Sequence, residues 1–264
     1  MIITDDFVMI NFPKTGSTFV RSVLHQIHHA RVHHKSPLRR LLSKDPEFVN
    51  LKLPNIRTTS FRKGLEDEHG ICYQIPEEHR QKKIVSVKRD LFDRIVSSYE
   101  YMDWKKAPWI SEGEIKERFP NYPNLGFEDY VHLLIEHNPL EVHPEINRKL
   151  PIGPLSSFFI LFYFKEPFEV LRSIDEAYIN SSKYKEDMFD VTFLDQANLN
   201  DELHRFLLSN GYKQKEIEFI LTEEKKNTTE KNGRTTRDYF ADPLLELIKE
   251  KEAFLYKVFG EYYV

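Results

Sequence analysis

Residues 7–29 read FVMINFPKTGSTFVRSVLHQIHH, and their pattern sets the expected architecture. Residues 7–12 are mostly apolar and favour a buried strand. Residues 13–16 interrupt this run with proline and glycine, and from residue 17 onward apolar side chains recur at helical spacing. The stretch therefore predicts a strand, a tight loop and a helix that continues to about residue 29.

The same order of elements recurs along the chain. Further strands are predicted at residues 84–87, 158–164 and 191–194, and the helices that follow them at 92–101, 166–177 and 200–209. Strands that alternate with helices are typical of an α/β fold, in which helices flank a parallel sheet on both faces. We therefore expect a single domain over residues 1–264 with a central parallel β-sheet. We interpret residues 104–154, which are rich in proline and aromatic residues, as an insertion in this domain.

The end of the chain predicts one more helix. Asp242 is the expected N-cap, Pro243 fits the first turn, and Gly260 is the expected stop. Apolar residues recur between these limits at the spacing of one helix face. This pattern indicates packing rather than a role in chemistry.

Composition narrows the class of protein. The 264 residues are 40% hydrophobic and 30% charged, which provides enough apolar surface for a packed core without disulfides or structural metals. The single cysteine, Cys72, cannot form an internal disulfide, so we expect a cytoplasmic location. The longest apolar run, residues 158–164, is far shorter than a membrane helix, and the N-terminus lacks the pattern of a secretory signal. We therefore expect no membrane span.

Charge is unevenly distributed along the chain. The formal net charge is −4, and we expect no nucleic-acid partner. Residues 11–44, however, contain seven lysine and arginine residues, five histidines and no acidic residue, so the rest of the chain carries −11. Such a segment is either a solvated basic face or part of an anion-binding site.

The loop at residues 13–18 has the chemistry of an anion site. A strand delivers it to a helix N-terminus, where free N–H groups and the helix dipole favour a phosphate or sulfate. Gly16 has no side chain, so an anion can approach the backbone closely there, and Lys14 supplies a positive charge. Hydroxyl groups are available at Thr15, Ser17 and Thr18. The chain lacks the G-x-x-x-x-G-K-[ST] pattern of a Walker A loop, so a magnesium-dependent NTPase is disfavoured.

A second candidate anion contact follows the strand at residues 84–87. Arg89 stands at the carboxyl end of this strand, where ligands bind in open parallel sheets. Ser97 lies about two helical turns further on, so its hydroxyl and the guanidinium of Arg89 could converge on one anion. An exposed arginine beside a helix-interior serine is the alternative interpretation.

Together these elements resemble those of the PAPS-dependent sulfotransferases. PKTGSTF at residues 13–19 is similar to the family's loop for the 5′-phosphosulfate, and RDLFDRIVSSY at residues 89–99 is similar to its 3′-phosphate element. The resemblance is nearest to the carbohydrate (Golgi-type) branch, which includes the uronyl 2-O-sulfotransferases. It is supported by EHG at residues 68–70, KNTTEK at 226–231 and the terminal FG at 259–260. Leu91 departs from the family, which commonly has proline there.

The resemblance implies a fold, a co-substrate and a set of binding residues. The fold would be the P-loop-NTPase-like sulfotransferase fold, and the sulfuryl donor would be PAPS, with no metal required. The 5′-phosphosulfate would be held by Pro13, Lys14, Thr15, Gly16, Ser17 and Thr18. The 3′-phosphate would be bound by Arg89 and Ser97. The segment at residues 227–237 would close over the nucleotide through Thr228, Thr229, Arg234 and Arg237.

The implied reaction is in-line transfer of the sulfuryl group to a hydroxyl of a carbohydrate or small metabolite. His69 is the candidate base, because it precedes the second strand by a spacing similar to that of the family's catalytic histidine and imidazole titrates near neutral pH. Glu66 and Glu68 are near enough in sequence to be rival bases. Lys14 is the expected catalytic cation, since it would stabilise charge on the leaving 5′-phosphate.

Several alternatives stay open at this point. His25, His29 and His33 recur at i, i+4 and i+8, so they could bind zinc or simply flank an anion site. The insertion also contains aromatic residues that would form either an acceptor wall or a core, namely Trp104, Trp109, Tyr122, Phe127 and Tyr130. The sequence favours a PAPS sulfotransferase, and the alternatives are a nucleotide kinase or NTPase-like protein and a non-catalytic anion- or glycan-binding module.

Overall fold

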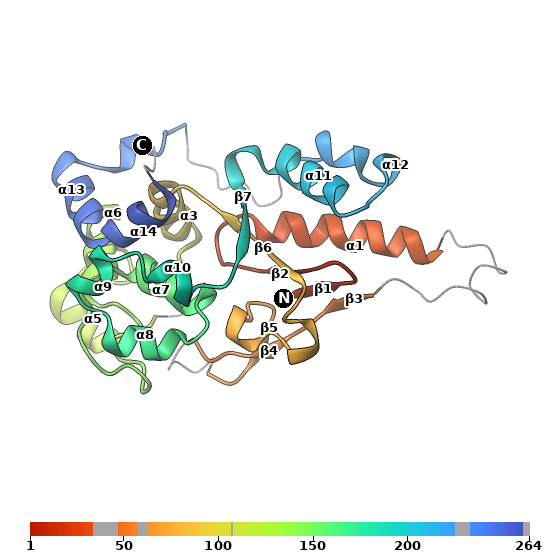
Figure 1. Ribbon diagram of the computed structural model, residues 1–264. Helices are drawn as coiled ribbons and strands as arrows, with labels where there is room; N and C mark the ends of the chain where they lie inside the picture. Colours follow the sequence, from red (N-terminus) through yellow and green to blue (C-terminus); the bar gives the residue numbers. More distant parts are fainter. Residues whose placement is uncertain (34–46, 58–62, 107, 225–232, 261–264) are drawn as a thin grey trace.

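A five-stranded sheet with strand order β3-β1-β2-β6-β7 forms the centre of the protein (Figure 1). The computed structural model describes residues 1–33, 47–57, 63–106, 108–224 and 233–260. The strands are β1 (Ile2–Thr4), β2 (Phe7–Ile10), β3 (Phe48–Asn50), β6 (Lys83–Lys88) and β7 (Val191–Asp195). A separate two-stranded sheet pairs β4 (Leu53–Pro54) with β5 (Glu66–Asp67).

The sheet is mixed rather than wholly parallel. β2, β6 and β7 run parallel, whereas β1 is antiparallel to both β2 and β3. The hydroxyl of Thr4 closes the short turn from β1 to β2, since it donates to the carbonyl of Phe7 and accepts from the N–H groups of Asp6 and Phe7. The expected α/β fold with a central parallel sheet is confirmed: β2, β6 and β7 form the parallel centre, and β1 adds antiparallel pairings with β2 and β3 at one side.

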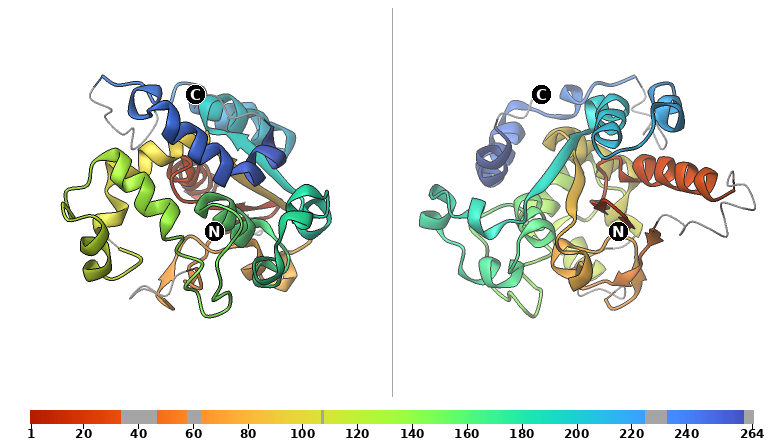
Figure 2. Two further views of the ribbon diagram at one scale, coloured as in Figure 1. Left: turned by 90° about the vertical axis from the view of Figure 1, so that its left-hand side faces the viewer. Right: turned by 45° about the vertical axis from the view of Figure 1, so that its right-hand side comes forward.

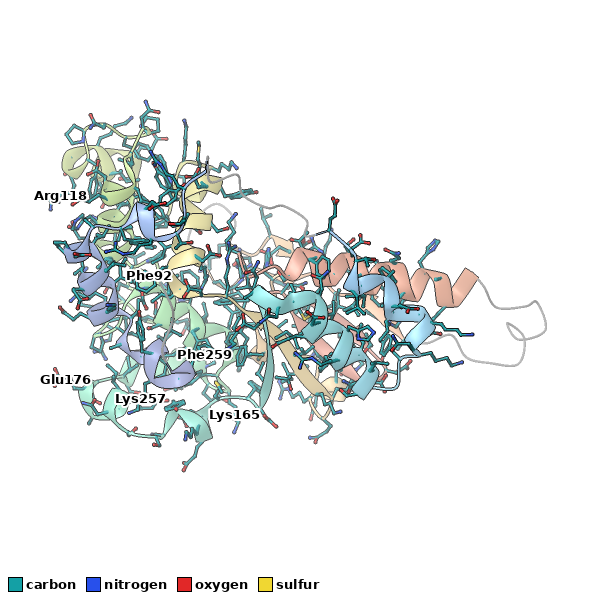
Figure 3. All side chains as sticks on the ribbon, turned by 90° about the horizontal axis from the view of Figure 1, so that it is seen from above. Phe92, Arg118, Lys165, Glu176, Lys257 and Phe259 are labelled. Atoms are coloured by element: carbon teal, nitrogen blue, oxygen red, sulfur yellow. The ribbon has the colours of Figure 1, made fainter. Side chains whose placement is uncertain are left out.

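Helices cover both faces of the sheet. One face carries α1 (Ser17–His33) and α11 (Leu199–Ser209), whose apolar side chains share a core cluster with Phe7 and Val85. The other face carries the C-terminal helices and those of the central part of the chain, which share a second cluster with Val8. Figure 2 shows this layering from two sides. Seen from above in Figure 3, Phe92 and Phe259 lie among the helices on the side away from α1.

The remaining helices are mostly short. They are α3 (Leu91–Tyr101), α4 (Asp103–Lys106), α5 (Glu112–Arg118), α6 (Phe127–Glu136), α7 (Pro154–Tyr163), α8 (Pro167–Ser173), α9 (Glu176–Asn180), α10 (Tyr184–Asp187), α12 (Gln214–Ile217), α13 (Asp242–Lys251) and α14 (Ala253–Phe259). None of the helices in the described part of the chain is both long and apolar enough to cross a membrane.

The strand expected at residues 158–164 is wrong, because residues 158–163 belong to α7 and Phe164 is its C-cap. Gly153 is the N-cap of α7, and Pro154 occupies its first turn, where the lost N–H costs nothing. Almost all of the helix is buried, including Ile160, Leu161 and Phe162 at 0% exposure. A helix enclosed on all sides has a continuous apolar sequence without a helical period, so it resembles a buried strand.

The single helix expected from Asp242 to Gly260 is two helices that meet at Glu252. Asp242 is the first residue of α13 rather than its N-cap, which is Ala241, whereas Gly260 ends α14 as expected. The carboxylate of Glu252 is buried and accepts hydrogen bonds from the N–H groups of Leu155 (3.0 Å) and Ser156 (2.7 Å). This glutamate therefore ends α13 and also provides acceptors for N–H groups in the first turn of α7, which have no partner inside their own helix.

The aromatic residues of the insertion contribute mainly to the core. Trp104, Tyr122 and Tyr130 are 3% to 5% exposed, so they cannot form a wall for an acceptor. Phe127 and Trp109 are half-buried and pack against the same cluster. Of the two interpretations of these residues, the core is the one that the structure supports.

Candidate functional site

The loop between β2 and α1 turns through two residues with left-handed backbone. Lys14 has φ 65° and Gly16 has φ 96°. A Cβ on Gly16 would lie 3.1 Å from Cδ2 of Leu199 and 3.3 Å from Cγ of Gln196, so both the conformation and the space favour glycine. β2 therefore passes directly into α1, whose N-terminus stands at the carboxyl end of the strand and favours an anion.

Two of the loop hydroxyls are used inside the loop. The side chains of Thr15 and Ser17 both donate to the carbonyl of Phe12, at 2.9 and 3.1 Å, and both are buried. These hydroxyls therefore brace the loop. Thr18, in contrast, is exposed at the start of α1, so of the three predicted hydroxyl groups it is the one that a ligand can reach from the surface. Pro13 is half-buried.

The ammonium group of Lys14 lies against an exposed aromatic ring. Its Nζ is 3.2 Å from the centroid of the Tyr101 ring, and Nζ of Lys106 is 3.5 Å from the same centroid. Tyr101 is 51% exposed at the end of α3. Two cation–π contacts on one ring concentrate positive charge beside the loop.

Arg89 connects the two predicted anion-binding elements. Its Nη1 donates to the carbonyl of Lys14 at 3.1 Å, and its Nε donates to Oδ2 of Asp93 at 2.7 Å. Ser97 lies on α3 and is 4% exposed. Within the described residues, none of the contacts of Arg89 involves Ser97. The structure therefore brings Arg89 to the loop and places Ser97 among the buried residues of its helix.

The ring of His69 is held in a form that can act as a base. Its Nδ1 is 2.7 Å from the carbonyl oxygen of Asn11, which can only accept, so Nδ1 carries the proton and Nε2 keeps its lone pair. Burial lowers the pKa of His69 and outweighs the hydrogen bond to Asn11, which favours the charged form. The imidazole is therefore neutral at pH 7, as a general base must be. Asn11 lies two residues before the loop, so its hydrogen bond holds the base beside the loop.

The two rival bases are less suitable. Arg21 pairs with the carboxylate of Glu68. Burial opposes ionisation of Glu68, but the hydrogen bond and charge of Arg21 hold its pKa below the ordinary value. Glu66 is exposed on β5. Geometry and charge therefore favour His69.

The segment expected to close over the nucleotide contacts the second element through a threonine. Thr236 donates from Oγ1 to Oδ1 of Asp93 at 2.8 Å. Arg237 is instead bonded to the Asp242 carboxylate and the Phe240 carbonyl, and Arg234 is exposed near the ring of Tyr239. The predicted ligands Thr228 and Thr229 lie outside the described residues.

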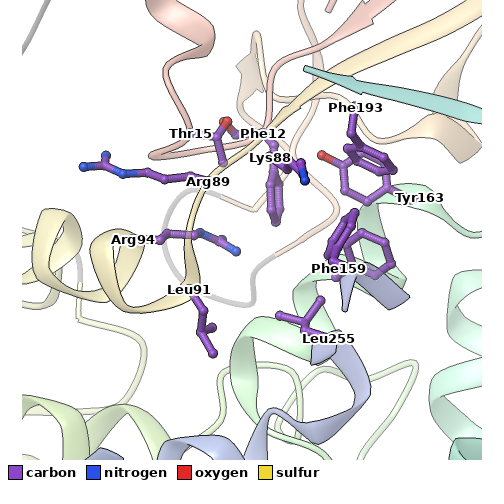
Figure 4. Close-up of a pocket in the computed structure, with 11 residues that line it drawn as sticks. Phe12, Thr15, Lys88, Arg89, Leu91, Arg94, Phe159, Tyr163, Phe193 and Leu255 are labelled. Atoms are coloured by element: carbon purple, nitrogen blue, oxygen red, sulfur yellow. The ribbon is translucent and has the colours of Figure 1, made fainter. Parts of the chain in front are cut away.

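A small pocket of about 20 Å³, with room for roughly one water molecule, adjoins the loop at the carboxyl ends of β6 and β7 (Figure 4). Its cations are Lys88 and Arg94, together with Arg89, and its aromatic residues are Phe12, Phe159, Tyr163, Phe193 and Phe259. The Arg94 guanidinium lies 4.1 Å from the centroid of the Phe12 ring. Figure 4 shows Arg94 turned toward these rings, whereas the guanidinium of Arg89 points away from them. Arg89 thus lines the pocket with the inner part of its side chain, and its guanidinium is directed away from the aromatic residues.

The α1 histidines whose side chains are described do not form a recognisable metal site. His25 and His29 are exposed, and the side chain of His33 lies outside the described residues. No group of three or more His, Cys, Asp or Glu residues suited to a metal occurs in the part of the chain that is described. His28 is buried, with Nε2 2.9 Å from the Tyr212 hydroxyl. The basic residues Lys35, Arg39, Arg40 and Lys44 also lie outside the described residues.

Sequence analysis missed three residues of this site. Asp93 lies four residues after Arg89 on a predicted helix, a spacing that could have identified the pair. Asn11 and Thr236 carried no such signal, because their partners His69 and Asp93 are 58 and 143 positions away.

The chain resembles known proteins in a family profile and in a solved structure. A search of curated proteins gave no match. The crystal structure of the mouse sulfotransferase SULT7A1 complexed with PAP is similar at 15% identity with a TM-score of 0.42, over 94% of this chain and 84% of that chain. Residues 4–164 match the sulfotransferase domain profile. Because this match spans more than half of the chain and includes the loop, His69 and Arg89, the protein belongs to the sulfotransferase domain family.

Proposed function

We propose that this protein transfers a sulfuryl group from PAPS to a hydroxyl of an acceptor and releases adenosine 3′,5′-bisphosphate. The observation that carries the proposal is the hydrogen bond from Arg89 to the carbonyl of Lys14. It joins a loop suited to a 5′-phosphosulfate with an arginine suited to a second phosphate. Membership of the sulfotransferase domain family supports sulfuryl transfer as the chemistry.

In the proposed reaction, the acceptor oxygen attacks sulfur while its proton passes to Nε2 of His69. The bond between sulfur and the bridging oxygen of the 5′-phosphate breaks, and negative charge grows on that oxygen. The Lys14 ammonium and the N–H groups at the start of α1 would stabilise this charge. Asn11 supports the role of His69, since its carbonyl keeps the ring proton on Nδ1.

Lys14 must leave the ring of Tyr101 to do this. A cation–π contact at an exposed site contributes about 0.5 to 1 kcal/mol. A hydrogen bond between charged groups contributes about 1.5 to 3 kcal/mol. A bound phosphosulfate would therefore outcompete Tyr101 for the ammonium of Lys14.

We infer that the acceptor is a carbohydrate or small metabolite with a ring and a negative charge. The cluster of Lys14, Tyr101 and Lys106 supports this inference, because an exposed aromatic face suits a sugar ring and a second ammonium suits an acidic substituent. The resemblance to the carbohydrate branch agrees with it. A cytoplasmic location is part of the proposal and is supported by the buried, unpaired Cys72.

Thermal denaturation with added nucleotides tests the proposal. Adenosine 3′,5′-bisphosphate is expected to raise the melting temperature more than ADP, or ATP with magnesium, at equal concentration. Equal shifts with all three nucleotides would contradict the 3′-phosphate assignment. Incubation with labelled PAPS and a panel of hydroxyl acceptors then separates an enzyme from a non-catalytic binding module, since only the enzyme transfers label.

A further inference from the structure

Asp93 lies at the centre of a chain of contacts that joins three separate parts of the molecule. Its Oδ2 accepts from Nε of Arg89 at 2.7 Å and is also 2.7 Å from Nη2, while its Oδ1 accepts from Thr236 at 2.8 Å. Arg89 in turn donates from Nη1 to the carbonyl of Lys14. The contacts therefore run from the loop through α3 to the segment at residues 233–240.

These contacts leave part of the Arg89 guanidinium available. Arginine has five N–H donors. Asp93 and the Lys14 carbonyl engage Nε and one N–H on each terminal nitrogen, so one N–H on each terminal nitrogen stays unused by the described residues. A pair of terminal N–H groups matches two oxygens of a phosphate. The side chain is only 14% exposed, so the guanidinium is already ordered.

We propose that Asp93 is a positioning residue, which orients Arg89 toward the 3′-phosphate and connects that arginine to Thr236. The inference rests on the proposed function. An ordered guanidinium loses less rotamer freedom on binding than a mobile one, so Asp93 increases affinity for the 3′-phosphate without touching it. One oxygen of Asp93 bonds to Arg89 and the other to Thr236, so the same carboxylate connects the segment at residues 233–240 to the proposed nucleotide site.

Calorimetric titration with two nucleotides tests this role. Adenosine 3′,5′-bisphosphate and AMP differ only in the 3′-phosphate. Asp93→Ala is expected to weaken binding of the bisphosphate about 10-fold, a change of about 1.4 kcal/mol, and to leave AMP binding within about 2-fold. In an Arg89→Ala background the same substitution should have no further effect on bisphosphate binding, because its partner is gone.

Glu100→Gln is the matched control. Glu100 also connects α3 to the segment at residues 233–240, by accepting from the Tyr239 hydroxyl at 2.6 Å, but it does not contact Arg89. Its substitution should leave the ratio of the two affinities unchanged. If Asp93→Ala does not fold, Asp93→Asn provides the test, since it keeps the shape of the side chain and removes the negative charge that pairs with Arg89.

Three results would overturn the proposal: an equal loss for both nucleotides, no loss for either, or the full loss in the Arg89→Ala background. The same titrations would show a different pattern if the proposed function itself were wrong. In that case Arg89→Ala alone would leave the preference for the bisphosphate over AMP unchanged, or the wild-type protein would show no such preference.

Discussion

The position of the proton on His69 determines which role this side chain can take. Because Asn11 holds the proton on Nδ1, we expect His69→Ala to lower kcat about 10²- to 10⁴-fold and to leave the affinity for adenosine 3′,5′-bisphosphate almost unchanged. Steady-state assays with PAPS and titration of the bisphosphate measure the two effects. Glu66→Gln, on exposed β5, is the control and should retain activity. Near-normal turnover in His69→Ala would exclude this residue as the base.

The same residue predicts a pH dependence. Burial lowers the pKa of His69 from its ordinary value of 6.5, so the ring is neutral and active at pH 7. Activity should fall only when the pH drops below 6.5, as the ring becomes protonated and Nε2 loses its lone pair. A profile of kcat/KM against pH measures the midpoint of this acid limb. A midpoint above 6.5 would contradict the burial of the ring.

Lys14 is expected to affect both binding and turnover. Lys14→Ala removes the positive charge of the loop itself, so it should weaken binding of adenosine 3′,5′-bisphosphate and lower sulfuryl transfer about 10²-fold or more. Lys106→Ala is the comparison, because it removes the other ammonium on Tyr101 and leaves the loop intact. It should leave nucleotide affinity nearly unchanged. Equal losses of nucleotide affinity in the two variants would place the anion nearer Tyr101 than the loop.

At the level of elements, the junction of α7 with α13 and α14 depends on one buried carboxylate. Glu252→Ala leaves the N–H groups of Leu155 and Ser156 without their acceptor and should lower the free energy of unfolding by about 2 to 4 kcal/mol. Glu250→Ala, two residues away and exposed, should change it by less than about 0.5 kcal/mol. Urea denaturation of both variants provides the measurement. Similar small changes in both would show that the cap contributes little.

For the whole molecule, His28 is expected to make stability depend on pH. Burial lowers the pKa of His28 from 6.5 to about 4, so the unfolded chain takes up a proton that the folded protein rejects. Stability should therefore fall as the pH drops from 6.5 toward 4, by about 3 kcal/mol at 1.36 kcal/mol per pH unit.

Urea denaturation at several pH values measures this slope. His28→Gln should be less stable at pH 7 and lose less stability on acidification than the wild-type protein does. His29→Gln, at an exposed position of the same helix, is the control and should keep the wild-type slope. An unchanged slope in His28→Gln would contradict the assignment.

Much of this arrangement could be predicted from local sequence. The strand, loop and helix at residues 7–29, the parallel strands at 84–87 and 191–194, and Arg89 at a strand end all depend on neighbouring residues, whose spacing reports their structure. The apolar run at residues 158–164 could not be assigned in this way, because burial on every side of α7 removes the period that identifies a helix.

The sequence by itself determined the α/β class and the chemistry of the loop, because the residues concerned are contiguous or a few helical turns apart. Only the tertiary structure decided which groups meet. Arg89 and the Lys14 carbonyl are 75 positions apart, and His69 and Asn11 are 58 apart. Arg89 reaches the loop because β2 and β6 pair in parallel, which brings their carboxyl ends to one edge of the sheet. The proton on His69 is placed by a backbone carbonyl, which every residue has, so no side-chain pattern could have indicated it.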